Sequence, residues 1–423
     1  MPHVDSYYAA TAHPAPRRPA LEGEVTADVC VIGAGITGCA AALELAERGY
    51  RVVLLEAEQV GWGASGRSGG QAIFGFGTGQ DTLVREAGLE TARRMWDLSV
   101  ESLAWVRSRV ARHTIDCDLQ WGHLHAALKG RQRRELLELK RELEETYGYW
   151  SLQFLEREEL GTLLDTPRYI AGLYDTGSGH LHPLNYTLGL ARAAEAAGAR
   201  IFEHSRVTRL EAGDPLRVET AGGSVRARFA VLARGGYVAG LHLKSDWRIM
   251  PVGTYVCATE VLGEARLRKL IRRNVAVADV NFVLDYFRCS ADHRLLFGGR
   301  VSYSGINEAD TGHATRARMI QVFPQLADVR LEYVWGGYVD ITMNRAPDFG
   351  RLGPNVFYLQ GFSGHGIAMG GMAGRLAAEA VAGQAERFDL FRRLTHHLFP
   401  GGPHLRTPAL VLAMLWFRLK DLL

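Results

Sequence analysis

The feature that most constrains the fold is a strand–turn–helix–strand unit near the N-terminus. An unbroken apolar run at 29–32 leads into the glycine turn Gly33–Ala34–Gly35–Ile36–Thr37–Gly38, and a second apolar run follows at 52–55. Unbroken apolar strands are typical of a parallel sheet covered on both faces. The sequence therefore predicts a βαβ unit within an α/β domain.

The spacing inside the glycine turn predicts a nucleotide site. Gly33 allows the tight turn, Gly35 lets the backbone approach a diphosphate, and Gly38 lets the helix lie close to the strand. The helix that begins near Ile36 offers its free N–H groups and the positive end of its dipole to that diphosphate. An ordinary strand–helix turn is the alternative interpretation.

An acidic residue at the end of the second strand extends this pattern. Glu56 follows Gly38 by 18 residues, about where a carboxylate accepts hydrogen bonds from ribose hydroxyls. A carboxylate at this position argues against a ribose 2′-phosphate. It does not separate NAD from FAD.

Composition narrows the class of protein. A chain of 423 residues predicts two domains, and a net charge of +3 gives no reason to expect nucleic acid as a partner. The five cysteines form no C-x-x-C pair, and residues 1–24 are polar and carry Pro14, Pro16 and Pro19, so we expect no leader and a reducing cytoplasm.

The C-terminal tail, Ala409–Leu423, comes nearest to the roughly 20 apolar residues that are needed to span a bilayer. Thr407 and Pro408 supply an N-cap and a first-turn proline, so we expect an amphipathic helix in the extension 396–423. The helix is too short and too charged to span a bilayer. It packs on the body or on a second subunit, or it lies on a membrane surface. The oligomeric state stays open.

Two H-x-H pairs raise the question of a metal. His123 and His125 form one pair, and His180 and His182 form the other. Alternation along a strand points both histidines of a pair the same way without an ion, and no Cys or acidic residue stands at ligand spacing. We expect no metal.

Two further glycine-rich segments favour FAD over NAD. A flavin needs its ring held as well as its ADP half, and the chain has glycine clusters at 61–71 and 361–371 in addition to the first turn. The second of these is a strand–turn–helix whose free N–H groups near Gly364–Gly366 are suited to stabilising negative charge on a reduced flavin.

These motifs resemble those of a known family. The sequence is similar to the FAD-dependent amine oxidases of the D-amino-acid oxidase/sarcosine oxidase fold, and within them to members that oxidise γ-glutamylputrescine. The similarity covers nearly the whole chain and is carried by these stretches: Ser6–Ala10, Gly61–Arg67, Gly179–Asn185, Leu284–Arg288, Phe323–Leu326, Gly361–Gly366 and Phe399–Gly402.

The resemblance implies a residue-by-residue FAD site. The ADP half is assigned to Gly33, Gly35, Ile36, Thr37, Gly38, Glu56 and Ala57, and adenine to the backbone of Val207. The ring and pyrophosphate are assigned to Ser65, Gly66, Arg67, Ser68, Gly70 and Gln71. His365, Gly366 and Ile367 are assigned to the pyrimidine edge of the ring. The other cofactor-binding residues are Ala233, Gly235, Arg345, Gly361 and Gly364.

The resemblance also implies a reaction, with two departures from the family. The expected reaction oxidises the free amine of a γ-glutamylated polyamine to an aldehyde, releasing ammonia and, with oxygen, hydrogen peroxide. No cysteine stands at Ile341–Met343, which implies non-covalent FAD. No lysine stands at Gly298–Arg300, so the electron acceptor stays open between oxygen and another acceptor such as a membrane quinone. A non-catalytic subunit that holds FAD is a further alternative.

Candidate catalytic residues are Arg300, Tyr286 and His365. Roughly one primary amine in 10³ is neutral at pH 7, so we expect the site to select the neutral amine by orientation and electrostatics without a dedicated base. The candidates for the glutamyl carboxylate are Arg288, Arg300 and Arg345, and those for an aromatic amine channel are Tyr255, Tyr286 and Trp335. Ordinary ion pairs and strand core are the alternatives.

The expected fold class is α/β. Segments 25–80, 182–240 and 346–395 form an FAD-binding, doubly wound, Rossmann-like domain, with a helix at 186–197 and strands at 200–202, 207–210, 216–220, 229–233 and 356–360. Segments 81–181 and 241–345 form an α+β substrate domain. Its first segment is expected to be mostly helical. Its second carries a mainly antiparallel sheet with strands at 253–261, 281–288, 294–301 and 331–339.

Overall fold

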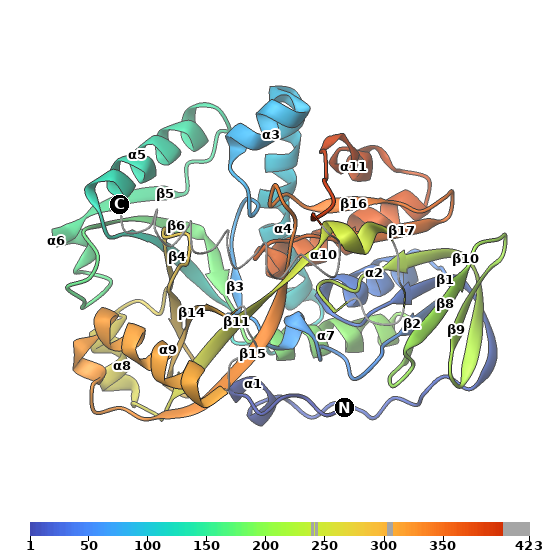
Figure 1. Cartoon of the computed structure of the whole chain (residues 1–423), viewed down its shortest axis with the longest axis horizontal. Coiled ribbons are helices and arrows are strands. Elements are labelled where there is room, and N and C mark those ends of the chain that lie inside the picture. The colour runs from blue at the N-terminus through green and yellow to red at the C-terminus, as the bar shows by residue number, and fades with distance from the viewer. Residues whose placement is uncertain (238–240, 242–243, 303–307, 401–423) are drawn as a thin grey trace.

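The computed structural model describes residues 1–237, 241, 244–302 and 308–400. The expected tail helix at 409–423 therefore lies outside the described residues. Figure 1 shows two sheets side by side, with helices around them. None of the helices in the described part of the chain is both long and apolar enough to cross a membrane.

The first sheet is mostly parallel and contains the βαβ unit. Its strands run in the order β16–β17–β10–β1–β2–β7, and β8 and β9 extend it beside β10. The bounds are β1 (Gly23–Ile32), β2 (Val52–Leu55), β7 (Arg200–Phe202), β8 (Val207–Glu211), β9 (Leu216–Thr220), β10 (Gly223–Leu232), β16 (Asp348–Arg351) and β17 (Val356–Gln360). The pairs β1–β2, β1–β10, β2–β7 and β10–β17 are parallel.

Helices cover one face of this sheet and a hairpin covers the other. Val29 and Val31 of β1 share a core with α2 (Ile36–Glu47), α7 (Pro183–Ala196) and α10 (Gly366–Val381). Cys30 and Ile32, which point the opposite way, share a second core with the antiparallel β8–β9 hairpin. The mixed α/β architecture predicted from the sequence is confirmed, with a hairpin in place of helices on the second face.

The second sheet is mostly antiparallel. Its strands run in the order β15–β11–β14–β13–β12–β4–β6–β3, with β5 beside β6. The bounds are β3 (Gln71–Ala72), β4 (Gln120–Ala127), β5 (Leu152–Glu156), β6 (Ala171–His180), β11 (Met250–Thr259), β12 (Ala276–Asp279), β13 (Tyr286–Cys289), β14 (Leu295–Ser302) and β15 (Leu331–Ile341). Only β12 and β4 pair in parallel within the described sheet.

The remaining helices surround the sheets. They are α1 (Tyr7–Ala10), α3 (Gln80–Ala87), α4 (Leu89–Arg112), α5 (Gly130–Glu145), α6 (Arg157–Leu160), α8 (Glu264–Leu270), α9 (Glu308–Val322) and α11 (Glu386–Asp389). Short 3₁₀ turns lie at Ala64–Gly66, Lys244–Arg248, Pro324–Leu326 and Phe391–Arg393. All five cysteines are buried and free of disulfide bonds.

Two expectations about secondary structure need correction. Segment 81–180 is mostly helical, as expected, but it also holds strands β4, β5 and β6, which build part of the second sheet and were not expected. The strand expected at 281–288 begins only at Tyr286, and 280–285 is the loop that joins β12 to β13. Apolar residues in that loop mimic a strand pattern because several of them line a cavity.

Candidate active site

A cavity of about 1250 Å³ lies between the two sheets. The turns after β1, β2 and β10, the glycine-rich loop at 61–71, the start of α10 and several strands of the second sheet form its wall. Pockets for drug-sized ligands measure roughly 300–1000 Å³. The cavity is therefore large enough for an extended dinucleotide together with a small substrate.

The turn between β1 and α2 is built for close approach. Gly33 has a φ of 100°, and a Cβ there would lie 2.6 Å from the carbonyl oxygen of Ala233. A Cβ at Gly35 would lie 2.8 Å from Oγ of Ser65, which accepts a hydrogen bond from the Ile36 N–H at 3.0 Å. The turn thus presents backbone and a hydroxyl group, with no side chain in the way of a ligand.

Glu56 lines the cavity at the end of β2, where two backbone N–H groups fix its carboxyl group. Its Oε2 accepts a hydrogen bond from the Ala34 N–H at 2.6 Å, and its Oε1 accepts one from the Glu58 N–H at 3.0 Å. Burial raises the pKa of Glu56, and these two backbone bonds partly offset that effect. The fixed carboxylate keeps lone pairs on both oxygens for hydroxyl donors in the cavity.

A second helix N-terminus meets the cavity from the opposite segment of the chain. Ser363 and Gly364 have φ values of 49° and 101°, which turn the chain sharply before α10. The N-cap of α10, His365, makes no side-chain capping bond, so the first N–H groups of the helix keep no capping partner. Gly364, Gly366 and Ile367 line the cavity, and the helix dipole there favours an anionic group.

His365 and Arg345 lie beside this helix end. Burial, with the nearby charges of Arg345 and His125, lowers the pKa of His365 to about 3, so its imidazole is neutral at pH 7. The Nδ1 of His365 and the Nε of Arg345 are buried without a hydrogen-bond partner among the described residues. Burial lowers the pKa of Arg345 as well, and its guanidinium lies 5.1 Å from the ring centroid of Phe282.

Most of the predicted cofactor-binding residues come together in the cavity wall. Those that line it are Gly33, Gly35, Ile36, Thr37, Glu56, Ala57, Ser65, Ser68, Gly70, Gln71, Val207, Ala233, Gly235, Arg345, Gly364, His365, Gly366 and Ile367. They come from segments far apart in the sequence, which the two sheets together bring to one cavity.

Four predicted residues lie behind the wall. Gly38 and Gly66 serve packing, because a Cβ at either would lie 1.8 Å from the Gly33 oxygen or 2.2 Å from the Gly61 oxygen. A Cβ at Gly361 would lie 2.6 Å from Cγ2 of Thr342. Arg67 folds back, donating from Nε to the Trp62 carbonyl at 2.7 Å with its guanidinium 4.2 Å from the centroid of the Trp62 ring.

Only some of the candidate substrate residues line the cavity. Tyr286, like His365, lines the cavity, whereas Tyr255 and Trp335 are not part of its wall. Trp335 is buried and donates to the Arg67 carbonyl at 2.9 Å. The backbone of Arg300 pairs with Tyr255 in the second sheet, and the side chain of Arg300 lies outside the described residues.

Arg288 stabilises the fold, because its side chain donates hydrogen bonds to three oxygen atoms of the protein. Its Nε donates to the Gly69 carbonyl at 2.8 Å, its Nη1 to the Cys289 carbonyl at 3.1 Å, and its Nη2 to the Tyr8 hydroxyl at 3.0 Å. These bonds join the glycine-rich loop to the second sheet and to the N-terminal segment. The side chain is buried and is not part of the cavity wall.

The histidine pairs have different roles. His123 and His125 point the same way, with ring centroids 4.5 Å apart, and His125 reaches the cavity wall. His180 ends β6, whereas His182 is the N-cap of α7 and accepts from the Asn185 N–H at 3.1 Å. Among the described residues, no three His, Cys, Asp or Glu side chains are placed to share a metal ion.

Sequence reasoning missed part of the wall. His125, Thr254 and the loop residues Asn281, Phe282 and Val283 line the cavity and were not predicted to do so. The H-x-H spacing was the available signal for His125. The loop residues carried no such signal in the sequence, because apolar residues in this pattern are also typical of a strand.

The cavity fits a flavin dinucleotide. It joins two helix N-termini, the Glu56 carboxyl group and a glycine-rich loop in one continuous space. A model of the family described as FAD dependent oxidoreductase matches residues 28–380. The chain belongs to this family of FAD-dependent oxidoreductases.

Relatives and solved structures agree with this assignment. This FAD-dependent oxidoreductase is 40% identical over 99% of its length to γ-glutamylputrescine oxidoreductase of Escherichia coli, of which it covers 98%. It is 39% identical over 99% of its length to the probable oxidoreductase OrdL of Haemophilus influenzae, of which it covers 97%. Glycine oxidase from Geobacillus kaustophilus has the same fold, with a TM-score of 0.74, 22% identity, and coverage of 88% of this chain and 100% of that one.

Proposed function

We propose that this enzyme oxidises the terminal primary amine of a γ-glutamylated polyamine such as γ-glutamylputrescine to an aldehyde, with release of ammonia. The 40% identity to the Escherichia coli enzyme over 99% of the chain supports this substrate class. FAD, when bound, supplies the two-electron oxidation. The residues of the chain select the substrate, orient it and keep its amine neutral.

The observation that carries the proposal is the unbalanced charge of Arg345. Three arginines line the described cavity wall: Arg206, Arg234 and Arg345. Arg206 pairs with Glu58 at 2.5 Å, and Arg234 pairs with Asp246 at 2.6 Å. Arg345 has no ion-pair partner among the described residues. A guanidinium in this state favours a carboxylate, which the glutamyl group supplies and a simple diamine lacks.

The same surroundings favour the neutral amine. Selecting the neutral form of a primary amine at pH 7 costs about 4–5 kcal/mol. Burial in the cavity lowers the pKa of a bound amine, which offsets part of this cost. His365 adds no charge, because its pKa is lowered to about 3.

Product analysis tests the proposal. The purified enzyme is incubated with γ-glutamylputrescine, and aldehyde and ammonia are measured with oxygen and then with a dye as acceptor. We expect both products in equal amounts, and hydrogen peroxide when oxygen is the acceptor. Dye reduction without peroxide would assign the enzyme to the dehydrogenases that use another acceptor. No aldehyde with either acceptor would contradict the proposal.

We further propose that FAD is bound non-covalently and that the enzyme works in the cytoplasm. None of the five cysteines lines the cavity, and all five are free, as expected in a reducing compartment. Acid precipitation should release all the yellow colour into the supernatant. Colour that stays with the precipitate would show a covalent link.

A further inference from the structure

Two glycines seat the ring of Tyr286 in the cavity wall. Tyr286 begins β13 and is paired with Gly298 of β14 in the sheet register. A Cβ at Gly298 would lie 2.3 Å from Cζ of Tyr286, and a Cβ at Gly69 would lie 2.4 Å from its Cε2. Both distances are shorter than any real carbon–carbon contact, so the ring occupies the space that a side chain at either position would need.

Backbone conformation does not require glycine at these two positions. Neither Gly69 nor Gly298 has a positive φ. Any residue can adopt such a backbone, and the nearest atoms that a side chain would meet at either position belong to the ring of Tyr286. Gly69 belongs to the glycine-rich loop and Gly298 to the second sheet, so the ring packs against two separate parts of the chain.

The loop before Tyr286 is fixed from behind by Arg318 of α9. Its Nη1 donates to the Gly299 carbonyl and its Nη2 to the Val283 carbonyl, each at 2.8 Å. Its Nε pairs with Oδ1 of Asp285 at 2.6 Å. The apolar residues Phe282, Val283 and Leu284 of this loop line the cavity together with Tyr286. This side of the cavity is therefore an apolar wall, and the bonds from Arg318 hold its backbone in place.

We propose that Gly69 and Gly298 are specificity-determining residues, because seating Tyr286 narrows the cavity to a passage for an unbranched alkyl amine. The proposal rests on the proposed function, which supplies the amine. A ring packed against both glycines excludes a branch beside the amine by steric overlap. A methylene chain fits along the ring and the loop and buries its apolar surface there.

A double-mutant cycle between Gly298 and Tyr286 tests the proposal. The variants Gly298→Ala, Tyr286→Ala and the double variant are mixed anaerobically with γ-glutamylputrescine and with its analogue methylated on the carbon that bears the amine. The apparent Kd is obtained from the way the rate of flavin bleaching depends on the amine concentration. Displacing the ring by about 1 Å should weaken γ-glutamylputrescine binding in Gly298→Ala by about 10- to 100-fold. Tyr286→Ala should reduce the discrimination against the methylated analogue.

The decisive comparison is the double variant, because Tyr286→Ala empties the space that a methyl group at position 298 needs. We expect the double variant to bind no more weakly than Tyr286→Ala alone. The proposal would be overturned if the two single substitutions weaken binding by factors that multiply in the double variant. It would also be overturned if Tyr286→Ala still discriminates against the methylated analogue as the wild type does. Gly130→Ala is the matched control, because a Cβ there meets nothing within 4 Å, and it should leave binding unchanged.

Urea unfolding of the same variants separates this proposal from the proposed function. The methyl group at 298 should destabilise the protein when Tyr286 is present and not when it is absent. If γ-glutamylputrescine fails to bleach the wild-type flavin, the proposed function fails, and with it the amine that the passage selects. Additive losses of stability would overturn the contact between glycine and ring whatever the substrate is.

Discussion

At the scale of single residues, the partners of each arginine decide which one is free to bind a ligand. Arg288 donates to three oxygen atoms of the protein and is buried away from the cavity. Arg345 lines the cavity and has a buried Nε without a partner. The sequence made both of them candidates, because it shows that an arginine is present and does not show what the arginine contacts.

Substitution of Arg345 tests its proposed role. Arg345→Ala should raise the KM for γ-glutamylputrescine about 10- to 100-fold, because a charge-assisted hydrogen bond contributes about 1.5–3 kcal/mol. Putrescine, which has no carboxylate, should keep its KM. Arg345→Lys should recover part of the loss, since it restores the charge and not the planar fork.

The FAD content of the Arg345 variants is the accompanying control. An equal rise in KM for both amines would show that Arg345 does not bind the glutamyl carboxylate. Loss of FAD with unchanged KM in the remaining holoenzyme would assign Arg345 to the cofactor instead.

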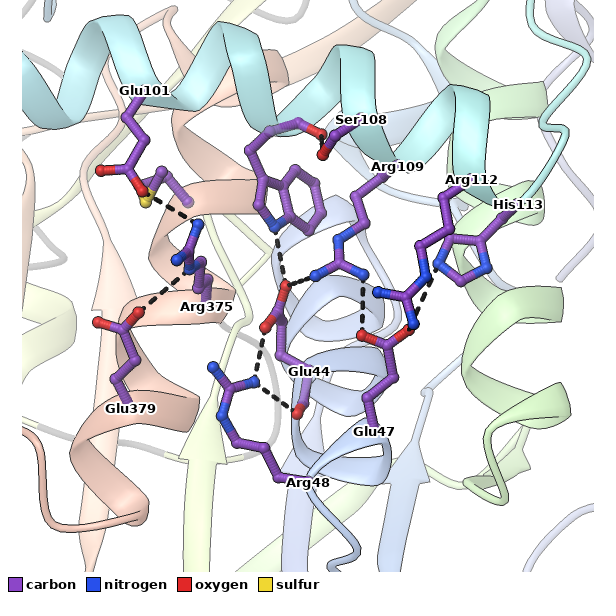
Figure 2. A network of polar contacts seen from close by, with 12 residues as sticks. Glu44, Glu47, Arg48, Glu101, Ser108, Arg109, Arg112, His113, Arg375 and Glu379 are labelled. Atoms are coloured by element: carbon purple, nitrogen blue, oxygen red, sulfur yellow. Dashed lines mark hydrogen bonds and ion pairs between the residues drawn. The ribbon is translucent and has the colours of Figure 1, made fainter.

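At the scale of elements, a polar network joins helices that are distant in the sequence. Figure 2 shows Glu44 of α2 facing α4. Glu44 accepts from Trp105 Nε1 at 2.9 Å, from Arg109 Nη2 at 2.5 Å and from Arg48 Nη1 at 2.6 Å. Burial by itself raises the pKa of Glu44, but the bonds from Arg48 and Trp105 and the charge of Arg109 lower it overall. The network fixes α4 against the nucleotide-binding unit.

Removing Glu44 should be costly. Glu44→Ala leaves Arg109 and the indole N–H of Trp105 without their acceptor, and breaking a buried ion pair costs about 3–5 kcal/mol in the free energy of unfolding. The exposed pair Arg131–Glu135 on α5, 3.4 Å long, is the control. Glu135→Ala should change stability by less than about 1 kcal/mol. Similar losses in urea unfolding of the two variants would contradict the role of the network.

The N-cap of α7 makes stability depend on pH. Burial and the nearby charge of Arg288 are the leading causes that lower the pKa of His182 to about 3. Between that value and the unfolded pKa of about 6.5, the unfolded chain binds a proton that the folded protein does not. Stability therefore falls as the pH falls below 6.5. Protonation also removes the Nδ1 lone pair that accepts from the Asn185 N–H.

His182→Asn isolates this contribution, because asparagine is also a good N-cap and does not titrate in this range. On going from pH 7 to pH 5, the wild type should lose about 2 kcal/mol more free energy of unfolding than the variant. Urea unfolding at the two pH values measures the difference. Equal losses would show that His182 is not protonated differently in the folded and unfolded states.

At the scale of the whole molecule, local patterns predicted the first sheet better than the second. The strands at 200–202, 216–220 and 356–360 have the bounds that the sequence predicts, because each is a short apolar or alternating run between clear turns. Strands β4 and β6 were missed, because helical segments surround them and their pairing joins residues far apart in the chain. The domain boundaries stay a prediction.

In the site, too, features with a local sequence pattern were predicted, and features that depend on distant segments were not. The three glycine clusters have local signatures, and residues of all three line the cavity. Tyr286 was predicted to line the substrate site, but its seat between Gly69 and Gly298 depends on three separate segments meeting. No local pattern contains such a meeting, so the contact of Tyr286 with the two glycines could not be predicted from the sequence.

The anaerobic spectrum of the purified enzyme tests the central claim most directly. The claim is that the cavity holds FAD and passes it electrons from the terminal amine of a γ-glutamylated polyamine. We predict a flavin absorbance band that γ-glutamylputrescine bleaches within seconds, with putrescine, γ-glutamylspermidine, sarcosine and D-alanine compared in parallel. A colourless protein after reconstitution with FAD, or a band that sarcosine or D-alanine bleaches and γ-glutamylputrescine does not, would contradict the account.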